Sequence, residues 1–392
     1  MTSPKVLVFV DYYLPGFKAG GPIPSVSRII EMADQCQFRV VTRDRDLGDS
    51  EPFRGVTPRS LTRLGKAQVI YMRSRFKDWW WVRKEIQAWK PDAYYFNSVH
   101  SLISTLVPLM LMRLRLFPEV KTIIIAPRGE LGFGALSLKS RKKSSCKPMI
   151  RWLIPSDVTW HASSPDEVDQ IKSWVASRLV SECKFVVAPD PAIEPAEFAS
   201  TGPMRKTIFS FASRIDRMKG LDQANRIMAI AGQKIELIWN ILGSVNDKKY
   251  LLEIEEQLTQ MPQGCEISRG DAFGPGESQV IFANSTAFVF PTLGENFGHV
   301  IAEALSVGCP VMVTANTPWT ELILSGAGGI IESDEQAAAQ LQSWAALTLE
   351  DQIALRESVL SIYKQWFESH EKVSNPFSVV YPGIDLDRNN PA

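Results

Sequence analysis

Two glutamates, Glu295 and Glu303, stand eight positions apart in the segment GENFGHVIAEAL. The first follows a glycine in an expected turn, and the second lies in a stretch whose apolar residues have helical spacing. At about 1.5 Å of rise per residue, the two carboxylates would lie up to about 12 Å apart. Two carboxylates that hydrolyse a glycosidic bond need a separation of roughly 5–9.5 Å. The spacing instead favours a long ligand with hydroxyl groups at both ends, such as a nucleotide-sugar with its sugar at Glu295 and its ribose at Glu303.

The diphosphate of such a ligand needs cations, and the segment SRIDRMKG supplies Arg214 and Lys219 directly after an apolar run. An arginine can hold phosphate oxygens with two parallel hydrogen bonds, and a lysine acts as a compact positive charge. When a phosphate group leaves, fixed cations stabilise the negative charge of the transition state. A helix N-terminus and Gly298 would let backbone N–H groups approach the same ligand.

Short apolar runs alternate with amphipathic stretches along the chain, which is the pattern of parallel sheets that helices cover on both faces. Strands are expected first at residues 6–10, 38–42, 69–72, 93–97, 122–126, 158–162 and 185–188. The pattern breaks at 189–203, which is rich in proline and small residues, as a linker should be. It restarts with strands expected at 207–212, 236–242, 288–291 and 310–314.

The predicted fold class is therefore α/β, with two Rossmann-like domains. We place them at residues 1–195 and 196–365, and expect the end of a helix and a tail at 366–392 to pack back on the N-terminal domain. Such sheets bind ligands at the carboxyl ends of their strands, so a cleft between the domains is the expected site. No GxGxxG follows the first strand, which disfavours a nicotinamide enzyme.

The net charge of the 392-residue chain is zero, but the charges are unevenly spread. Residues 1–200 carry an excess of nine basic residues, and the remainder carries an excess of nine acidic ones. This asymmetry indicates that the first half meets something anionic, unless it reflects chance on solvated faces.

The five cysteines are scattered and form no CxxC pair, as in proteins of a reducing compartment. No signal peptide opens the sequence, and its longest apolar stretch, at 101–112, is shorter than the roughly 20 residues that a bilayer span needs. We expect a cytoplasmic protein without a membrane span and without a nucleic-acid partner.

The motifs together resemble retaining glycosyltransferases of the GT-B fold, family 4, the glycosyl transferases group 1. The resemblance rests on GENFGHVIAEAL with the following SVGCPV, on TPWTEL and SRIDRMKG, and on the N-terminal YYLPGFKAGG. The segment APRGELGFGALSLKSRKK is similar to one in members that build bacterial surface polysaccharides. The resemblance covers most of the chain. It implies two parallel sheets that face each other across a cleft, and sugar transfer with retained anomeric configuration.

The resemblance also implies roles for individual residues. Arg214 and Lys219 would hold the donor diphosphate as it leaves, Glu295 would orient the sugar, and Glu303 would bind the ribose. Further donor contacts would come from Gly20, Gly21, Ala272, Phe273, Asn296, Phe297, Gly298, His299 and Val300. The simpler interpretations are a helix-capping acid for Glu295 and a solvated helix acid for Glu303. Arg214 and Lys219 could be surface cations, and Gly20 and Gly21 could form an ordinary turn.

The chain departs from the family pattern at Arg128. Many members have a histidine there, after the strand at 122–126, and a guanidinium is not a general base. Arg128 and His100 are predicted on the acceptor side, although a packed core or rim histidine is the simpler interpretation of His100. The TRDRD segment at 42–46 matches the DxD of metal-dependent glycosyltransferases, but we interpret its aspartates as loop residues and expect no metal or other cofactor.

The basic segment KSRKKSSCK is either a solvated loop or a patch for anionic lipid or a lipid-diphosphate acceptor. The second interpretation predicts peripheral membrane contact through 139–151 at the inner face of the membrane. The expected partners are a UDP- or GDP-linked sugar and a lipid-linked or saccharide acceptor of cell-surface glycan synthesis. The alternatives are a small soluble acceptor, a GT-B epimerase and a non-catalytic binder of nucleotide-sugars.

Overall fold

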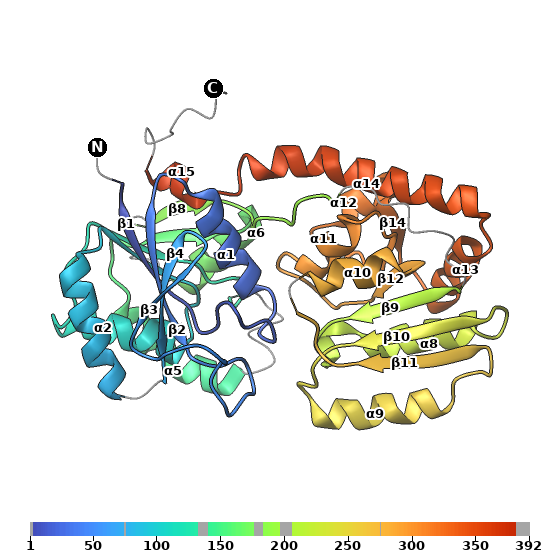
Figure 1. Ribbon diagram of the computed structural model, residues 1–392, viewed down its shortest axis with the longest axis horizontal. Coiled ribbons are helices and arrows are strands. Elements are labelled where there is room, and N and C mark those ends of the chain that lie inside the picture. The colour runs from blue at the N-terminus through green and yellow to red at the C-terminus, as the bar shows by residue number, and fades with distance from the viewer. Residues whose placement is uncertain are drawn as a thin grey trace. The chain divides into compact units, whose positions relative to one another are not determined.

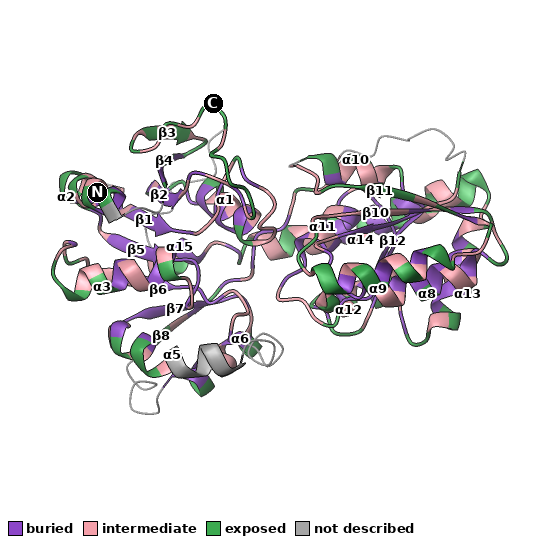
Figure 2. Cartoon of the chain, turned by 90° about the horizontal axis from the view of Figure 1, so that it is seen from below, coloured by how far each residue is buried: buried purple, intermediate pink, exposed green. Residues whose placement is uncertain are grey.

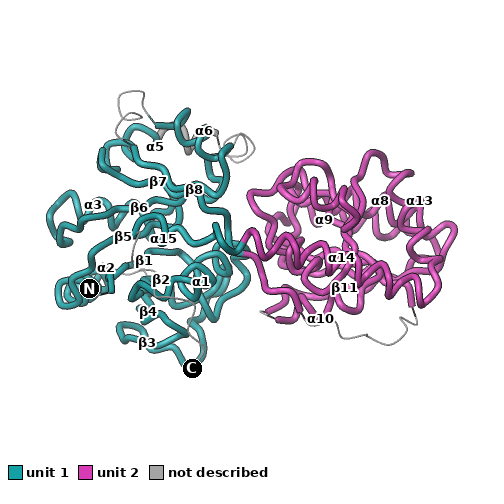
Figure 3. Tube along the Cα trace, turned by 90° about the horizontal axis from the view of Figure 1, so that it is seen from above, with its two compact units in different colours: residues 1–191, 371–392 teal, residues 192–370 magenta. Residues whose placement is uncertain are grey.

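The computed structural model describes residues 3–73, 76–131, 140–175, 183–196, 206–274 and 276–381. The chain forms two compact units, which are residues 1–191 with 371–392, and residues 192–370 (Figure 3). Each unit is a mostly parallel sheet with helices on both faces (Figure 1). Among the described residues, no helix combines the length and the apolar character that a bilayer crossing requires.

The sheet of the N-terminal unit has the strand order β3-β4-β2-β1-β5-β6-β7-β8, and only β3 runs antiparallel to its neighbour. Its strands are β1 (Lys5–Phe9), β2 (Gln37–Arg43), β3 (Leu61–Leu64), β4 (Ala67–Met72), β5 (Ala93–Phe96), β6 (Thr122–Ile125), β7 (Thr159–Ala162) and β8 (Lys184–Val187). Its helices are α1 (Pro22–Met32), α2 (Phe76–Trp89), the π-helix η1 (Leu102–Leu106), α3 (Val107–Arg113), α5 (Ser140–Leu153), α6 (Pro165–Trp174) and α15 (Pro376–Val380).

Alternate residues of its central strands feed two separate cores, because successive side chains of a strand point to opposite faces. Val6 and Val8 pack in the core under α1, whereas Leu7 and Phe9 pack in the core under α2, α3, α5 and α6. Figure 2 shows these central strands as buried, with helices on either side of the sheet. Apolar residues are needed on both faces, which is why these strands have continuous apolar sequences.

The segment after residue 371 completes the first of these cores. The ring of Phe377 on α15 lies 5.3 Å from that of Phe38 and 5.7 Å from that of Tyr95. Asn375 donates a hydrogen bond of 3.3 Å to the carbonyl of Met32, at the end of α1. Residues 371–381 are therefore part of the N-terminal unit.

The sheet of the C-terminal unit is parallel throughout, in the order β11-β10-β9-β12-β13-β14. Its strands are β9 (Ile208–Ala212), β10 (Leu237–Leu242), β11 (Cys265–Gly270), β12 (Ala287–Phe290), β13 (Val311–Val313) and β14 (Gly328–Ile330). Its helices are η2 (Arg217–Lys219), α8 (Leu221–Ala231), α9 (Lys248–Thr259), α10 (Glu277–Ala283), α11 (His299–Leu305), α12 (Thr320–Leu322), η3 (Ile323–Ala327), α13 (Asp334–Ala345) and α14 (Leu349–Glu371). The strand order reverses between β9 and β12, the point at which doubly wound sheets bind ligands.

A buried arginine on α14 holds two loops of this unit. Arg356 donates to the carbonyls of Ser285 (2.8 Å), Phe282 (3.2 Å) and Val307 (3.1 Å). Gly308 has φ +71°, and a Cβ there would lie 2.5 Å from the carbonyl oxygen of Arg356. The glycine of the SVGCPV motif is therefore required by the close approach of α14.

Replacing Arg356 with Met is expected to lower the free energy of unfolding of the C-terminal unit by roughly 3 kcal/mol, because buried carbonyls lose their donors. Urea unfolding of the full chain measures the change. The matched control is Arg269→Met, which removes an exposed ion pair with Glu255 and should change that free energy by less than about 1 kcal/mol. Equal effects of the two substitutions would contradict the structural role of Arg356.

Candidate functional site

Arg214, Lys219 and Glu295 lie on two loops that meet at the strand-order reversal of the C-terminal unit. One loop follows β9 and the other follows β12, and these strands are neighbours in the sheet. Gly220 ends the first loop with φ +71°, and a Cβ there would lie only 2.0 Å from the carbonyl oxygen of Pro291. The backbone N–H of Leu293 also donates to the carbonyl of Met218 at 2.9 Å. The two loops therefore pack backbone against backbone, which only glycine permits at position 220.

Lys219 and Glu295 form an ion pair between these loops. Lys219 Nζ lies 2.6 Å from Glu295 Oε1, and the two side chains are 14% and 12% exposed. The hydroxyl of Thr292 lies 3.0 Å from the same carboxylate oxygen, and Lys219 Nζ lies 5.6 Å from the centre of the Phe290 ring. Because the pair is mostly shielded from water, its charges interact more strongly than those of a surface pair. The structure thus brings the predicted lysine and the first predicted glutamate together.

Arg214 lies on the same loop as Lys219, close after β9, and is half-buried. Within the part of the chain that the structure describes, its guanidinium has no hydrogen bond or ion pair. Arg217, between them in sequence, is exposed and pairs with Glu253 on α9. Of these three cations, Arg214 is the one whose donors are not already used by the described residues.

The loop at 295–298 is not helical, and this corrects one prediction. α11 begins at His299, because Gly298 has φ +83° and interrupts a helical path from Glu295. The rise of about 1.5 Å per residue therefore does not apply between the two glutamates. Glu303 lies within α11 and is half-buried.

The side chains of this loop pack inward. Phe297 is 7% exposed, and its ring lies 4.8 Å from that of His299 and 5.3 Å from that of Trp319. The indole N–H of Trp319 donates to the carbonyl of Phe297. Val300 packs against the core of the unit. What Phe297 can offer a ligand is therefore its backbone.

The remaining predicted donor residues of this unit also lie in segments that follow strands or begin helices. Ala272 and Phe273 follow β11 and are half-buried, and Phe273 packs against the core. Asn296 is half-buried on the loop after β12. β9, β11 and β12 thus each present predicted residues at the carboxyl edge of one sheet.

In the N-terminal unit, Gly20 and Gly21 lie on the loop between β1 and α1. Gly20 has φ +73° and open space where a Cβ would be, and the carbonyl of Gly21 accepts from the backbone N–H of Ser25 at 3.1 Å. The carboxylate of Asp46 fixes this loop by accepting from the backbone N–H groups of Phe17 (2.6 Å) and Lys18 (3.0 Å). The second aspartate of TRDRD therefore has a structural role.

Arg128 is held by a buried network of this unit. Its guanidinium donates to Asn97 Oδ1 (2.9 Å) and Tyr95 Oη (2.7 Å) and pairs with Asp190. Burial lowers the pKa of Arg128, but the charges of Asp190 and its neighbours outweigh this and the pKa is raised. Its acceptor-side role stays a prediction, and its described contacts all lie within this unit.

His161 belongs to the same network and is a packed core histidine. Nδ1 lies 2.8 Å from Tyr95 Oη and Nε2 lies 2.8 Å from the carbonyl oxygen of Ala188. Burial, with the nearby charge of Arg128, lowers the pKa of His161 to about 3. The imidazole is therefore neutral at physiological pH.

His100 pairs with Glu130, which sequence reasoning did not single out. Glu130 accepts from the backbone N–H groups of Val99 (2.8 Å) and His100 (3.0 Å) and from the hydroxyl of Ser98 (2.7 Å), and lies 3.2 Å from His100 Nδ1. Burial raises the pKa of Glu130, but hydrogen bonds from His100, Ser98 and Val99 outweigh it and the pKa is lowered. An ionised Glu130 accepts from Nδ1–H, so Nε2 is the ring nitrogen of His100 that Glu130 does not engage.

Three further residues support the site, and the sequence signalled them weakly. Thr292 stands two residues before the motif GENFGHVIAEAL, and Trp319 stands inside TPWTEL, where the motif marks the segment but does not assign a contact. Glu130 stands in APRGEL, and only the fold brings it to His100, thirty positions earlier.

Comparison with known proteins gives a family match and a curated relative. The family model described as Glycosyl transferases group 1 matches residues 193–359. The D-inositol 3-phosphate glycosyltransferase of Arthrobacter sp. (strain FB24) is 27% identical over 152 residues, 38% of this chain and 36% of that protein. The chain thus matches little more than a third of the length of this relative.

Solved structures resemble the whole chain at low sequence identity. WaaG, a glycosyltransferase involved in lipopolysaccharide biosynthesis, is 14% identical with a TM-score of 0.62, covering 96% of this chain and 100% of WaaG. Anabaena HepE, in complex with UDP-glucose, is 14% identical with a TM-score of 0.63, covering 96% of each chain. Such likeness shows the fold alone. The chain has the two-domain α/β fold of GT-B glycosyltransferases, and residues 193–359 match the glycosyl transferases group 1 family.

Proposed function

We propose that the chain is a glycosyltransferase that moves a sugar from a nucleotide diphosphate-sugar to an acceptor hydroxyl. The observation that carries the proposal is the meeting of Lys219 with Glu295 where the strand order reverses, on the loop that also holds Arg214, which has no partner among the described residues. A sheet of this order binds nucleotides outside that point. Two fixed cations there would hold a diphosphate, and the adjacent carboxylate would hold a sugar.

The chemistry follows from these charges. As the bond between the anomeric carbon and the phosphate oxygen breaks, negative charge develops on the diphosphate, where Arg214 and Lys219 stabilise it. Glu295 stabilises the positive charge that develops on the sugar. The acceptor hydroxyl attacks from the face that the phosphate leaves, and its proton passes to the departing phosphate oxygen, so the configuration is retained. Because the side chains supply the positive charge, no metal is required.

For the acceptor we propose a lipid-linked or saccharide intermediate of cell-surface glycan synthesis, reached by a cytoplasmic enzyme that associates peripherally with the membrane. The segment APRGELGFGALSLKSRKK and the lipopolysaccharide role of WaaG support this class. A small phosphorylated acceptor is the second candidate, because the Arthrobacter relative is a D-inositol 3-phosphate glycosyltransferase.

On the acceptor side we assign a positioning role to His100. Glu130 fixes the ring through Nδ1, so Nε2 can accept a hydrogen bond from an acceptor hydroxyl. This arrangement orients the hydroxyl and does not require Arg128 to act as a base.

The proposed reaction is tested by incubating the full chain with UDP- and GDP-sugars, with and without extracted lipid-linked saccharides and sugar phosphates. We expect transfer with retained anomeric configuration that EDTA does not abolish. Loss of activity on EDTA and its return with magnesium would refute the metal-free mechanism. Turnover of donor without acceptor would indicate an epimerase, and donor binding without any turnover would indicate a binding module.

Lys219→Ala is expected to lower kcat about 10²- to 10³-fold, because one fixed cation is lost from the developing charge. The matched control is Arg217→Ala, which removes a nearby exposed cation that pairs with Glu253 and should leave kcat within about twofold. Steady-state kinetics and a thermal melt measure both variants. Equal loss of activity in the two would exclude a specific role for Lys219.

His100→Ala is expected to raise the KM for the acceptor roughly tenfold while donor binding is unchanged, because one hydrogen bond is worth about 1.4 kcal/mol. Glu130→Gln, which frees the ring to change tautomer, should move the KM in the same direction and alter the pH profile. An effect on donor binding instead would contradict the acceptor-side assignment.

A further inference from the structure

Large apolar side chains are exposed on two neighbouring helical segments of the N-terminal unit. Leu102, Met110 and Leu114, on and next to η1 and α3, are 65%, 37% and 60% exposed. Met149 and Trp152, on α5, are 46% and 55% exposed. The spacings of four between Met110 and Leu114 and of three between Met149 and Trp152 place each pair on one helical face. We call these five residues the α3–α5 surface.

The two segments form one continuous surface. The guanidinium carbon of Arg113, at the end of α3, lies 4.8 Å from the centre of the Trp152 ring. The inner faces of both helices are fixed in the core, where Leu109, Ile150 and Leu153 are 1–2% exposed. Met110, Met149 and Trp152 are thus presented outward by helices that are anchored in the core, and Leu114 directly follows α3.

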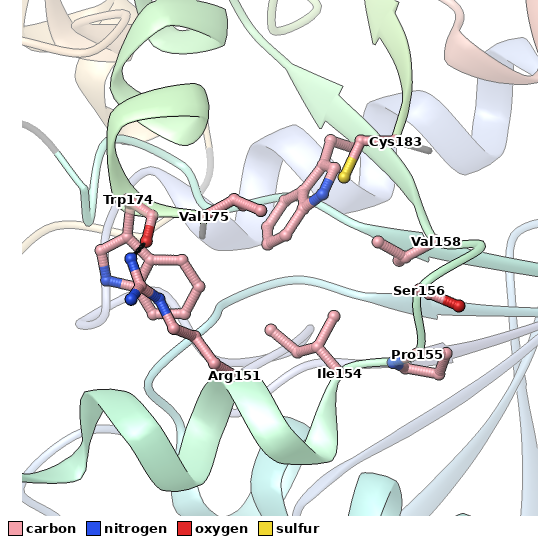
Figure 4. Close-up of a pocket in the computed structure, with 9 residues that line it drawn as sticks. Arg151, Ile154, Pro155, Ser156, Val158, Trp174, Val175 and Cys183 are labelled. Atoms are coloured by element: carbon pink, nitrogen blue, oxygen red, sulfur yellow. Dashed lines mark hydrogen bonds between the residues drawn. The ribbon is translucent and has the colours of Figure 1, made fainter. Parts of the chain in front are cut away.

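The end of α5 is also fixed to α6. Arg151 donates to the carbonyl of Trp174, and both residues line an apolar pocket with Ile154, Val158 and Val175 (Figure 4). Trp160 of β7 also lines the pocket, so the ends of α5 and α6 meet the sheet there. Because Arg151 is held by its hydrogen bond to Trp174, Trp152, one residue after Arg151, has a defined position.

The two chain segments that carry the α3–α5 surface have charges of one sign. Residues 93–118 and 131–156, which are followed by Glu119 and Asp157, contain no aspartate or glutamate. They contain the cations Arg113, Arg115, Lys139, Arg141, Lys142, Lys143, Lys147 and Arg151. Lys139 lies outside the described residues, and for 141–143 the structure describes the backbone alone. The predicted membrane contact through 139–151 therefore falls largely outside the side chains that the structure describes. Arg113, Arg115 and the five apolar residues of the surface are among the described residues.

We propose that the α3–α5 surface binds the headgroup region of an anionic bilayer. Exposed leucine, methionine and tryptophan beside arginine is the composition of helices that lie in a membrane interface. Each cation near an anionic surface strengthens binding about fivefold. Symmetric pairing of this surface with the same surface of a second copy would bring cations against cations, which disfavours a twofold dimer through it. The proposal concerns binding alone and does not depend on the sugar-transfer reaction.

Sedimentation of the full chain with vesicles tests it. We expect binding to phosphatidylcholine vesicles that contain about a third phosphatidylglycerol, weaker binding at high salt, and little binding to phosphatidylcholine alone. The double variants Leu114→Ser/Trp152→Ser and Arg113→Gln/Arg115→Gln should each lose tenfold or more in vesicle affinity. Arg115→Gln alone, at an exposed loop position, provides a mild variant should the others fail to fold, and should lose about fivefold.

The matched control is Lys248→Gln/Leu252→Ser on α9, which removes an exposed cation and a leucine that is 70% exposed. It should bind vesicles like the unaltered protein. The proposal is overturned if the unaltered protein does not bind anionic vesicles, or if the α3–α5 variants bind as tightly as the control. A dimer in light scattering that the α3–α5 variants abolish would assign the surface to a second copy, and would likewise overturn it.

Discussion

The approach of Gly220 to the carbonyl of Pro291 joins the loop after β9 to the loop after β12, and the candidate site depends on this contact. Without a side chain at 220, the two backbones touch, and Lys219 and Glu295 come within hydrogen-bonding distance. The strand order makes the loops neighbours, and the glycine lets them meet. The hydroxyl of Thr292 donates a hydrogen bond to the carboxylate of Glu295.

The ion pair has a consequence for how the site would receive an anionic ligand. Lys219 is already neutralised by Glu295, whereas Arg214 has no partner among the described residues. An incoming diphosphate would therefore meet Arg214 first and would share Lys219 with the carboxylate. Glu295 in turn keeps a cation beside it, which lowers the cost of holding a carboxylate in a largely buried position.

The sequence predicted the central strands of both sheets, because residues buried on two faces leave continuous apolar runs such as those of β1, β5 and β12. It did not predict β11 and β14, whose sequences CEISRG and GGI lack such a run, nor β3, an antiparallel edge strand. Edge strands are stabilised by pairing more than by burial, so their composition is a weak signal.

For the site, the motifs singled out Arg214, Lys219, Glu295 and Glu303 as candidates. They could not predict contacts between residues that are distant in sequence. The pairing of Glu130 with His100 and the enclosure of Arg128 by Asp190 join residues 30 and 62 positions apart. No local pattern specifies such pairs. The start of α11 was also misjudged, because the apolar spacing continues through Gly298 although its left-handed backbone does not permit a helix there.

The place of Phe377 has a consequence for synthesis on the ribosome. This residue completes a core of the N-terminal unit, yet it leaves the exit tunnel only after the entire C-terminal unit. This core of the first sheet therefore stays incomplete, with apolar residues such as Phe38 exposed, while the second unit is translated and folds. Nascent chains of this protein are thus expected to need protection by chaperones for longer than a domain that is contiguous in sequence.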